Sequence, residues 1–200
     1  MSKSALQSLE TIVPLSDGGT QVSKNPVINE YEQGKRFLEQ REYSQAAVAL
    51  HNALVGYEEI GDEAGVANAS NQLGNVCLAR QEFENALKNY ERALAICEKA
   101  NDRMSILAVS NKIVAAQKGL KQYDKAIARC LEMLDHYQDN RDPQGTVTTL
   151  EEMAGIYVSS GRREKAADTY RTIASIHKNF GHKNIAAGYL EKAAELAANT

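Results

Sequence analysis

Apolar and polar positions along this chain repeat with a period of 40 residues. The segments REYSQAAVALHNAL, QEFENALKNYERAL, KQYDKAIARCLEML and GRREKAADTYRTIA align without a gap. One column of this alignment holds only alanine, and four residues later stands a second column of mostly bulky residues. The two columns are Ala46, Ala86, Ala126 and Ala166, and Leu50, Tyr90, Cys130 and Tyr170. Because residues four apart lie on one face of an α-helix, the pattern predicts four amphipathic helices in the same register.

A column of mostly small residues precedes each of these helices, at Gly34, Gly74, Val114 and Ala154. A larger side chain follows three residues later, at Phe37, Cys77, Gln117 and Tyr157. A small side chain lets two helix axes approach, and a larger one a turn later fills the groove beside the contact. Each 40-residue unit is therefore predicted to be a helical hairpin.

The segments between the units carry signals for helix ends. Three aspartates are predicted N-caps and two glycines are predicted helix terminators. Two prolines stand at predicted first helical positions, one directly after an asparagine and one directly after an aspartate. These residues are Asp62, Asp102 and Asp142; Gly61 and Gly181; and Pro26 after Asn25 and Pro143 after Asp142. Residues 182–198 predict one more helix, which we expect to cap the array with a polar outer side and to complete the chain.

Together these columns resemble the tetratricopeptide repeat, which has a small residue in its first helix and Ala, a bulky residue and Ala in its second. Repeat two, ASNQLGNVCLARQEFENALKNYERAL, is close to that pattern throughout, whereas repeat three departs from it at Val114, Gln117 and Met133. The usual repeat has ~34 residues. The longer unit resembles the arrays of kinesin light chains, Pins-type polarity adaptors and bacterial regulators.

This resemblance implies an all-α fold, a right-handed α-solenoid of four helical hairpins plus a C-terminal capping helix. The expected repeats are about 26–60, 61–100, 101–140 and 141–180, followed by the capping helix 182–198, all within one repeat domain of residues 26–200. Residues 1–25 are expected to be a flexible N-terminal segment and linker. In that segment Leu6, Leu9, Ile12, Val13 and Leu15 form a short apolar pattern. It is interpreted either as a frayed terminus or as a segment that docks on repeat one or in the groove.

Composition narrows the function classes. The net charge is -3, aromatic residues make up 6%, and basic residues form no block, which argues against nucleic acid as a partner. No apolar run has signal-peptide length or approaches the ~20 residues of a membrane span. We therefore expect a cytoplasmic protein without membrane insertion. Cys77, Cys97 and Cys130 have no CxxC spacing and are interpreted as reduced core thiols.

Catalytic signals are missing from the sequence. The four histidines, His51, His136, His177 and His182, form no HExxH motif, no cluster with cysteine and no Ser/His/Asp signature. Gly18 and Gly19 lack the lysine and the strand-to-helix context of a phosphate loop. The sequence thus predicts no enzyme, no cofactor and no metal site.

In the tetratricopeptide family the first helix of each hairpin lines the concave groove. Helical spacing around the small-residue column then selects the candidate partner-binding residues of this chain: Tyr31, Lys35, Asn68, Asn71, Asn75, Asn111, Lys112, Lys118 and Glu151. Asparagine offers both a donor and an acceptor, so Asn71, Asn75 and Asn111 are expected to hold a peptide backbone from an exposed face. The alternative is that they are ordinary solvated residues. The positions do not reproduce the carboxylate clamp of chaperone-binding relatives.

Our first hypothesis is a non-enzymatic scaffold or adaptor that receives a peptide or helix of a partner protein in its groove. The alternative is a self-assembling protein that forms homo-oligomers through its N-terminal segment or its end repeats. A sensor of the bacterial peptide-pheromone type would need a further N-terminal domain, for which about 25 residues are expected to leave no room. The sequence does not identify the partner.

Overall fold

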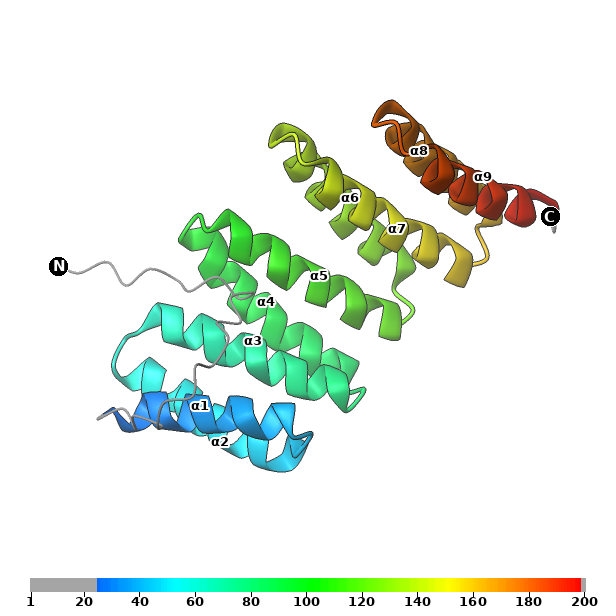
Figure 1. Cartoon of the computed structure of the whole chain (residues 1–200). Coiled ribbons are helices and arrows are strands. Elements are labelled where there is room, and N and C mark those ends of the chain that lie inside the picture. The colour runs from blue at the N-terminus through cyan, green and yellow to red at the C-terminus, as the bar shows by residue number, and fades with distance from the viewer. Residues whose placement is uncertain (1–24, 199–200) are drawn as a thin grey trace. The chain divides into compact units, whose positions relative to one another are not determined.

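A computed structural model of the chain describes residues 25–198, and these residues form nine α-helices and no strand (Figure 1). The predicted all-helical repeat fold is thereby confirmed. The apolar pattern between Leu6 and Leu15 lies outside the described residues. The helices are α1 (Pro26–Glu39), α2 (Tyr43–Glu59), α3 (Glu63–Ala79), α4 (Phe83–Lys99), α5 (Arg103–Gly119), α6 (Tyr123–Asp139), α7 (Pro143–Ser159), α8 (Arg163–Asn179) and α9 (Lys183–Ala198).

The chain divides into two compact units, one ending at Gly119 and the other beginning at Leu120. In the first unit each helix packs against the next, and α3 also contacts both α1 and α5. The helices α1, α3 and α5 therefore form one layer, and α2 and α4 form a second. In the second unit α6, α7, α8 and α9 likewise pack in consecutive pairs. A single repeat domain over residues 26–200 stays a prediction.

Every turn between two helices has the same backbone design. Helices α2 to α8 each contain 17 residues, and one residue with a left-handed backbone recurs every 20 residues. In the turn after α2, the Gly61 N–H donates to the Glu58 carbonyl and the Asp62 N–H donates to the Tyr57 carbonyl. These bonds pair carbonyl groups that the helix end would otherwise leave unbonded. The eight left-handed residues are Arg41, Gly61, Gln81, Asn101, Lys121, Arg141, Gly161 and Gly181.

All four predicted side-chain caps are present. The Asn25 carboxamide oxygen accepts from the Val27 N–H at 3.0 Å. Asp62, Asp102 and Asp142 each accept from the N–H three residues later, at 3.0, 3.2 and 2.9 Å respectively. Because the first N–H groups of a helix have no partner within it, these bonds stabilise the start of each helix.

The core follows the predicted columns. The four alanines of the first column are fully buried, and so are Leu50, Tyr90 and Cys130 of the bulky column. The small-residue column marks close contact between helices, because a Cβ at Gly34 would lie 2.6 Å from Leu50 Cγ. All three cysteines are free, but only Cys97 and Cys130 are buried, and Cys77 is half-buried.

The terminal helix α9 forms where the sequence predicts it, but its outer side is not uniformly polar. It buries only Ala186 and Ala193, and the side chains of Ile185 and Leu190 are 49% and 52% exposed. The expectation of a polar outer side is therefore wrong at these two positions.

Candidate functional site

One layer of the first unit carries most of the predicted partner-binding residues. Because α1, α3 and α5 are neighbours, the residues that they contribute lie in one layer of that unit, which we call the α1–α3–α5 face. Glu151 lies in α7 of the second unit. The first-unit residues are Tyr31 and Lys35 on α1; Asn68, Asn71 and Asn75 on α3; and Asn111, Lys112 and Lys118 on α5.

Asn75 is the centre of a hydrogen-bond network that joins α3 to α4 and α1. Its Nδ2 donates to Gln72 Oε1 at 2.9 Å, and its Oδ1 accepts from the Tyr90 hydroxyl at 2.9 Å. Gln72 also forms a side-chain hydrogen bond with Tyr31. The network fixes the orientation of the Asn75 amide before any partner arrives.

Gly74 allows this network to form. A Cβ at position 74 would lie 2.4 Å from Cε1 of Tyr90, so the absence of a side chain lets the ring cross α3. The ring itself is fully buried and its hydroxyl reaches Asn75. Burial raises the pKa of Tyr90, which keeps the hydroxyl protonated and able to donate.

Tyr31 and Lys35 form the α1 side of the face. The Tyr31 ring meets the Tyr57 ring edge-on with centroids 6.1 Å apart. Burial raises the pKa of Tyr31 to about 12, and the hydrogen bond with Gln72 opposes that shift. The Lys35 Nζ lies 5.4 Å from the Tyr31 ring centroid and 3.2 Å from a carboxylate oxygen of Glu32. The Lys35 charge is thus already partly neutralised within α1.

Asn71 contradicts the expectation of an exposed groove residue, because its side chain is only 5% exposed. It occupies α3, which has α1 on one side and α5 on the other. Its buried Oδ1 accepts no hydrogen bond from the described part of the chain. A buried acceptor without a partner costs about 1–3 kcal/mol. The face therefore contains a carbonyl oxygen that lacks a donor.

The remaining first-unit residues differ in burial. Asn68 is half-buried, and Asn111 and Lys112 are exposed. The Asn111 Nδ2 donates to the Leu107 carbonyl of its own helix at 3.1 Å. Lys118 is half-buried and interacts with other groups. The predicted residues thus share a face without being equally accessible.

In the second unit, Glu151 of α7 is bonded to α9. Its carboxylate accepts a hydrogen bond from the Tyr189 hydroxyl. Burial and this carboxylate raise the pKa of Tyr189 to about 12. The Glu151 carboxylate is therefore engaged in holding α9 against α7.

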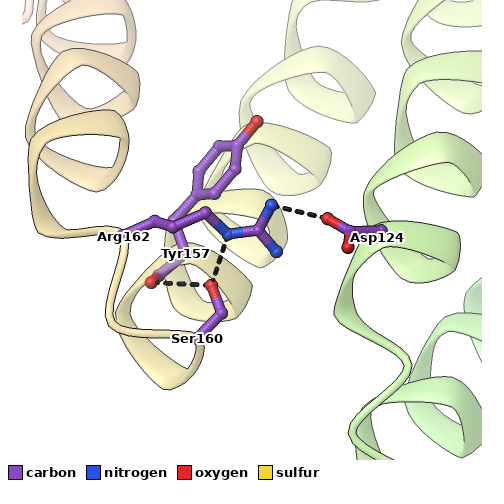
Figure 2. A network of polar contacts seen from close by, with 4 residues as sticks. All are labelled: Asp124, Tyr157, Ser160 and Arg162. Atoms are coloured by element: carbon purple, nitrogen blue, oxygen red, sulfur yellow. Dashed lines mark hydrogen bonds and ion pairs between the residues drawn. The ribbon is translucent and has the colours of Figure 1, made fainter.

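A second polar network in this unit ties the turn between α7 and α8 to α6 (Figure 2). The Arg162 guanidinium donates to Asp124 at 2.6 Å and to the Ser160 hydroxyl at 2.8 Å, and its Cζ lies 5.4 Å from the Tyr157 ring centroid. Ser160 in turn donates to the Tyr157 carbonyl at 3.0 Å. These contacts link three helices through one arginine, and we assign the network a structural role.

Within residues 25–198 no three His, Cys, Asp or Glu side chains are grouped as they are around a metal ion. Among the described helices, none combines the length and the apolar character that crossing a bilayer requires.

Sequence reasoning missed Gln72 and Tyr90 as parts of the site. Tyr90 was identified only as a member of the bulky column, and Gln72 was not among the candidate binding residues. The available signal was the combination of Gly74, Asn75 and Tyr90, because no other repeat has glycine and asparagine opposite a tyrosine. The sequence alone does not show which aromatic ring packs over Gly74, so this combination could not be recognised as part of the site.

The layered pairs of equal helices and their repeated turns define a tetratricopeptide-type helical repeat. Residues 69–104 and 149–184 match the tetratricopeptide repeat model. These two segments cover most of repeats two and four of the predicted array and extend into the start of the following helix. The resemblance inferred from the sequence is confirmed, and tetratricopeptide repeats occupy these two segments.

Solved structures show the same fold. The apo form of RapI is 14% identical with a TM-score of 0.67, and the alignment covers 88% of this chain and 54% of RapI. A putative kinesin light chain of Podosopora anserina with nearly identical TPR-like repeats is 14% identical with a TM-score of 0.65, over 88% of this chain and 98% of that one. No curated protein sequence matches the chain.

A third similar structure is the Rap conjugation gene regulator of plasmid pLS20 in complex with the Phr* peptide. It is 14% identical with a TM-score of 0.61, over 96% of this chain and 60% of the regulator. The chain thus spans between half and two thirds of the length of the two Rap proteins. At these identities the likeness concerns the fold.

Proposed function

We propose that the protein is a cytoplasmic, non-enzymatic interaction module that binds an extended peptide segment of a partner protein. The segment lies on the face formed by α1, α3 and α5, where the asparagines bond its backbone. The fold supports this proposal, because one solved protein with the same fold is a complex with a peptide. The absence of any catalytic motif in the sequence is consistent with it.

The unpaired Oδ1 of Asn71 is the observation that carries the proposal. An extended peptide presents backbone N–H groups, which are the donors that this oxygen lacks. We propose that the carboxamide rotates when the peptide binds, so that the buried acceptor gains the bond that it lacks. Asn75, whose amide is already oriented by Gln72 and Tyr90, offers a second fixed contact beside it.

The test begins with peptides selected from a random library against the wild-type chain. We expect Asn71→Ala to weaken the selected peptide roughly tenfold, which corresponds to about 1.4 kcal/mol. Asn52→Ala is the matched control, because Asn52 is exposed on α2 in the other layer. Its affinity should equal that of the wild type.

A second experiment tests whether the protein recognises the backbone of the peptide. N-methylation of the peptide, one residue at a time, removes single backbone donors. We expect N-methylation at one peptide position to weaken binding to the wild type as much as Asn71→Ala does. The same N-methylated peptide should bind the Asn71→Ala variant no more weakly than the unmethylated peptide does. If N-methylation is harmless everywhere, or if Asn71→Ala binds as the wild type does, backbone capture by Asn71 is wrong.

Self-assembly is the second candidate, and the exposed apolar residues of α9 favour it. Ile185 and Leu190 are about half exposed on a helix that buries only two alanines. A second copy could cover these side chains through its own α9. Sedimentation across a concentration range would show a dimer in the wild type and a monomer in Leu190→Glu. A wild type that remains monomeric at high concentration excludes this candidate.

A further inference from the structure

The turn after α8 brings two histidines together. The His182 N–H donates to the His177 carbonyl at 2.9 Å, and the same bond joins Arg162 to Tyr157 in the turn after α7. In this turn the side chain of the donor residue lies beside the side chain of the acceptor residue five positions earlier. The contact of Arg162 with the Tyr157 ring is an example (Figure 2). At the last turn both side chains are imidazoles.

The two rings approach through their Nδ1 atoms, which lie 3.3 Å apart. The His177 ring stacks on the Tyr189 ring with centroids 5.5 Å apart and an interplanar angle of 5°. The His182 ring stacks on Phe180 at 6.3 Å and 26°. Aromatic neighbours therefore hold both rings in orientation. His182 is exposed and His177 is half-buried, so an ion has access from solvent.

We propose that the Nδ1 atoms of His177 and His182 form a Zn²⁺ site. Two Zn–N bonds of about 2.0–2.1 Å at a tetrahedral angle hold their nitrogens about 3.3–3.4 Å apart. Adjacent positions of a square or octahedral site with the same bond lengths would hold them about 2.8–3.0 Å apart. The metal-free contact of 3.3 Å is short enough for both nitrogens to bind one tetrahedral zinc ion with little movement.

Only two protein ligands take part in this site. No third His, Cys, Asp or Glu joins the pair among the described residues, so water completes the coordination. Lys178 and Lys183 adjoin the two histidines in the chain, and the Lys192 Nζ lies 5.0 Å from the Tyr189 ring centroid. These cations weaken the binding, and the Glu151 carboxylate, which accepts from the Tyr189 hydroxyl, carries the opposite charge. The site is accordingly weaker than a four-ligand zinc centre.

Zinc would fasten the end of α8 to the start of α9. Because the two histidines are held together only in the folded turn, bound zinc favours the folded state of this hairpin. The site would make the attachment of the terminal helix depend on zinc concentration.

The first experiment titrates Zn²⁺ into the full chain without an affinity tag, in a reducing buffer at neutral pH, by calorimetry. We expect one Zn²⁺ per chain, and a loss of affinity of at least tenfold in His177→Gln and in His182→Gln. The control is the double variant His51→Gln with His136→Gln, which removes the other two histidines and should bind like the wild type. Binding that survives in both single variants overturns the proposal.

A second measurement needs no variant. Nitrogen-15 spectra of the histidine side chains report which ring nitrogen is bound. We expect zinc to shift the Nδ1 resonances of His177 and His182 and to leave His51 and His136 unchanged. If the wild type binds no zinc saturably, or if those Nδ1 resonances do not move, the contact is only a hydrogen bond between two rings and the proposal fails.

Discussion

Asn75 and Tyr90 couple the candidate site to the core, and this coupling can be measured. Asn75→Ala should lower the free energy of unfolding by about 1–3 kcal/mol, because it leaves the buried Tyr90 hydroxyl without its acceptor. Tyr90→Phe removes the hydroxyl itself, so the double variant should be more stable than the two single losses predict. Urea unfolding of the four proteins gives the coupling energy. Strict additivity would mean that the bond contributes nothing.

The raised pKa of Tyr31 predicts that the folded state loses stability at alkaline pH. Its pKa rises from 10.0 to about 12 in the folded chain, so the folded state keeps a proton that the unfolded state releases. The stabilisation is complete below pH 10 and is lost as the pH rises from about 10 to about 12. Urea unfolding at several pH values should show this decline, and Tyr31→Phe should make it shallower. A decline of equal slope in the variant would assign it to other tyrosines.

The sequence predicted the environment of single residues less well than it predicted the repeated columns of buried and small residues. A helical wheel groups Asn71 with the other candidate residues of α3, but it does not count the neighbouring helices α1 and α5, and the side chain is buried. His177 and His182 seemed unrelated because they belong to no motif and are separated by a turn. In both cases the deciding contact comes from another helix, which periodicity within one helix cannot reveal.

Two glycines on first helices should respond to substitution in opposite directions. Gly74→Ala places a Cβ 2.4 Å from the Tyr90 ring and should destabilise the fold by about 1–3 kcal/mol. Gly155→Ala meets nothing within 4 Å and should stabilise α7 by about 1 kcal/mol, because alanine is the better helix former. Thermal or urea unfolding checks both. Equal effects would show that the small-residue column does not mark close packing.

The helices themselves could be predicted because their signals are local and repeated. Caps such as Asp62 and Asp142, and buried columns such as the four alanines, recur in register with the 40-residue sequence repeat. The left-handed turn residues were only partly predictable. Glycine marks three of the eight, but Gln81 and Arg141 adopt the same backbone with a side chain, in turns that form the same two hydrogen bonds as the turn at Gly61.

Across the whole chain, stability should vary from helix to helix, because each helix packs mainly against its neighbours in sequence. The helix α4 buries Tyr90, Leu94 and Cys97, whereas α9 buries only two alanines. We expect backbone amides of α9 to exchange with deuterium well before those of α4. Hydrogen exchange followed by mass spectrometry measures this order. Comparable protection of α9 and α4 would point to a further contact that covers α9.

The 20-residue spacing of the left-handed turn residues has a consequence for how such a chain can change length. A gene deletion that removes residues 61–100 would join Ile60 to Asn101, and Asn101 has the same left-handed backbone as the Gly61 it replaces. The new junction would inherit a complete turn, including an aspartate, Asp102, to begin the next helix. Unequal recombination between repeats therefore preserves the backbone conformation of the turn at the junction, so a change in repeat number need not disrupt the helix ends.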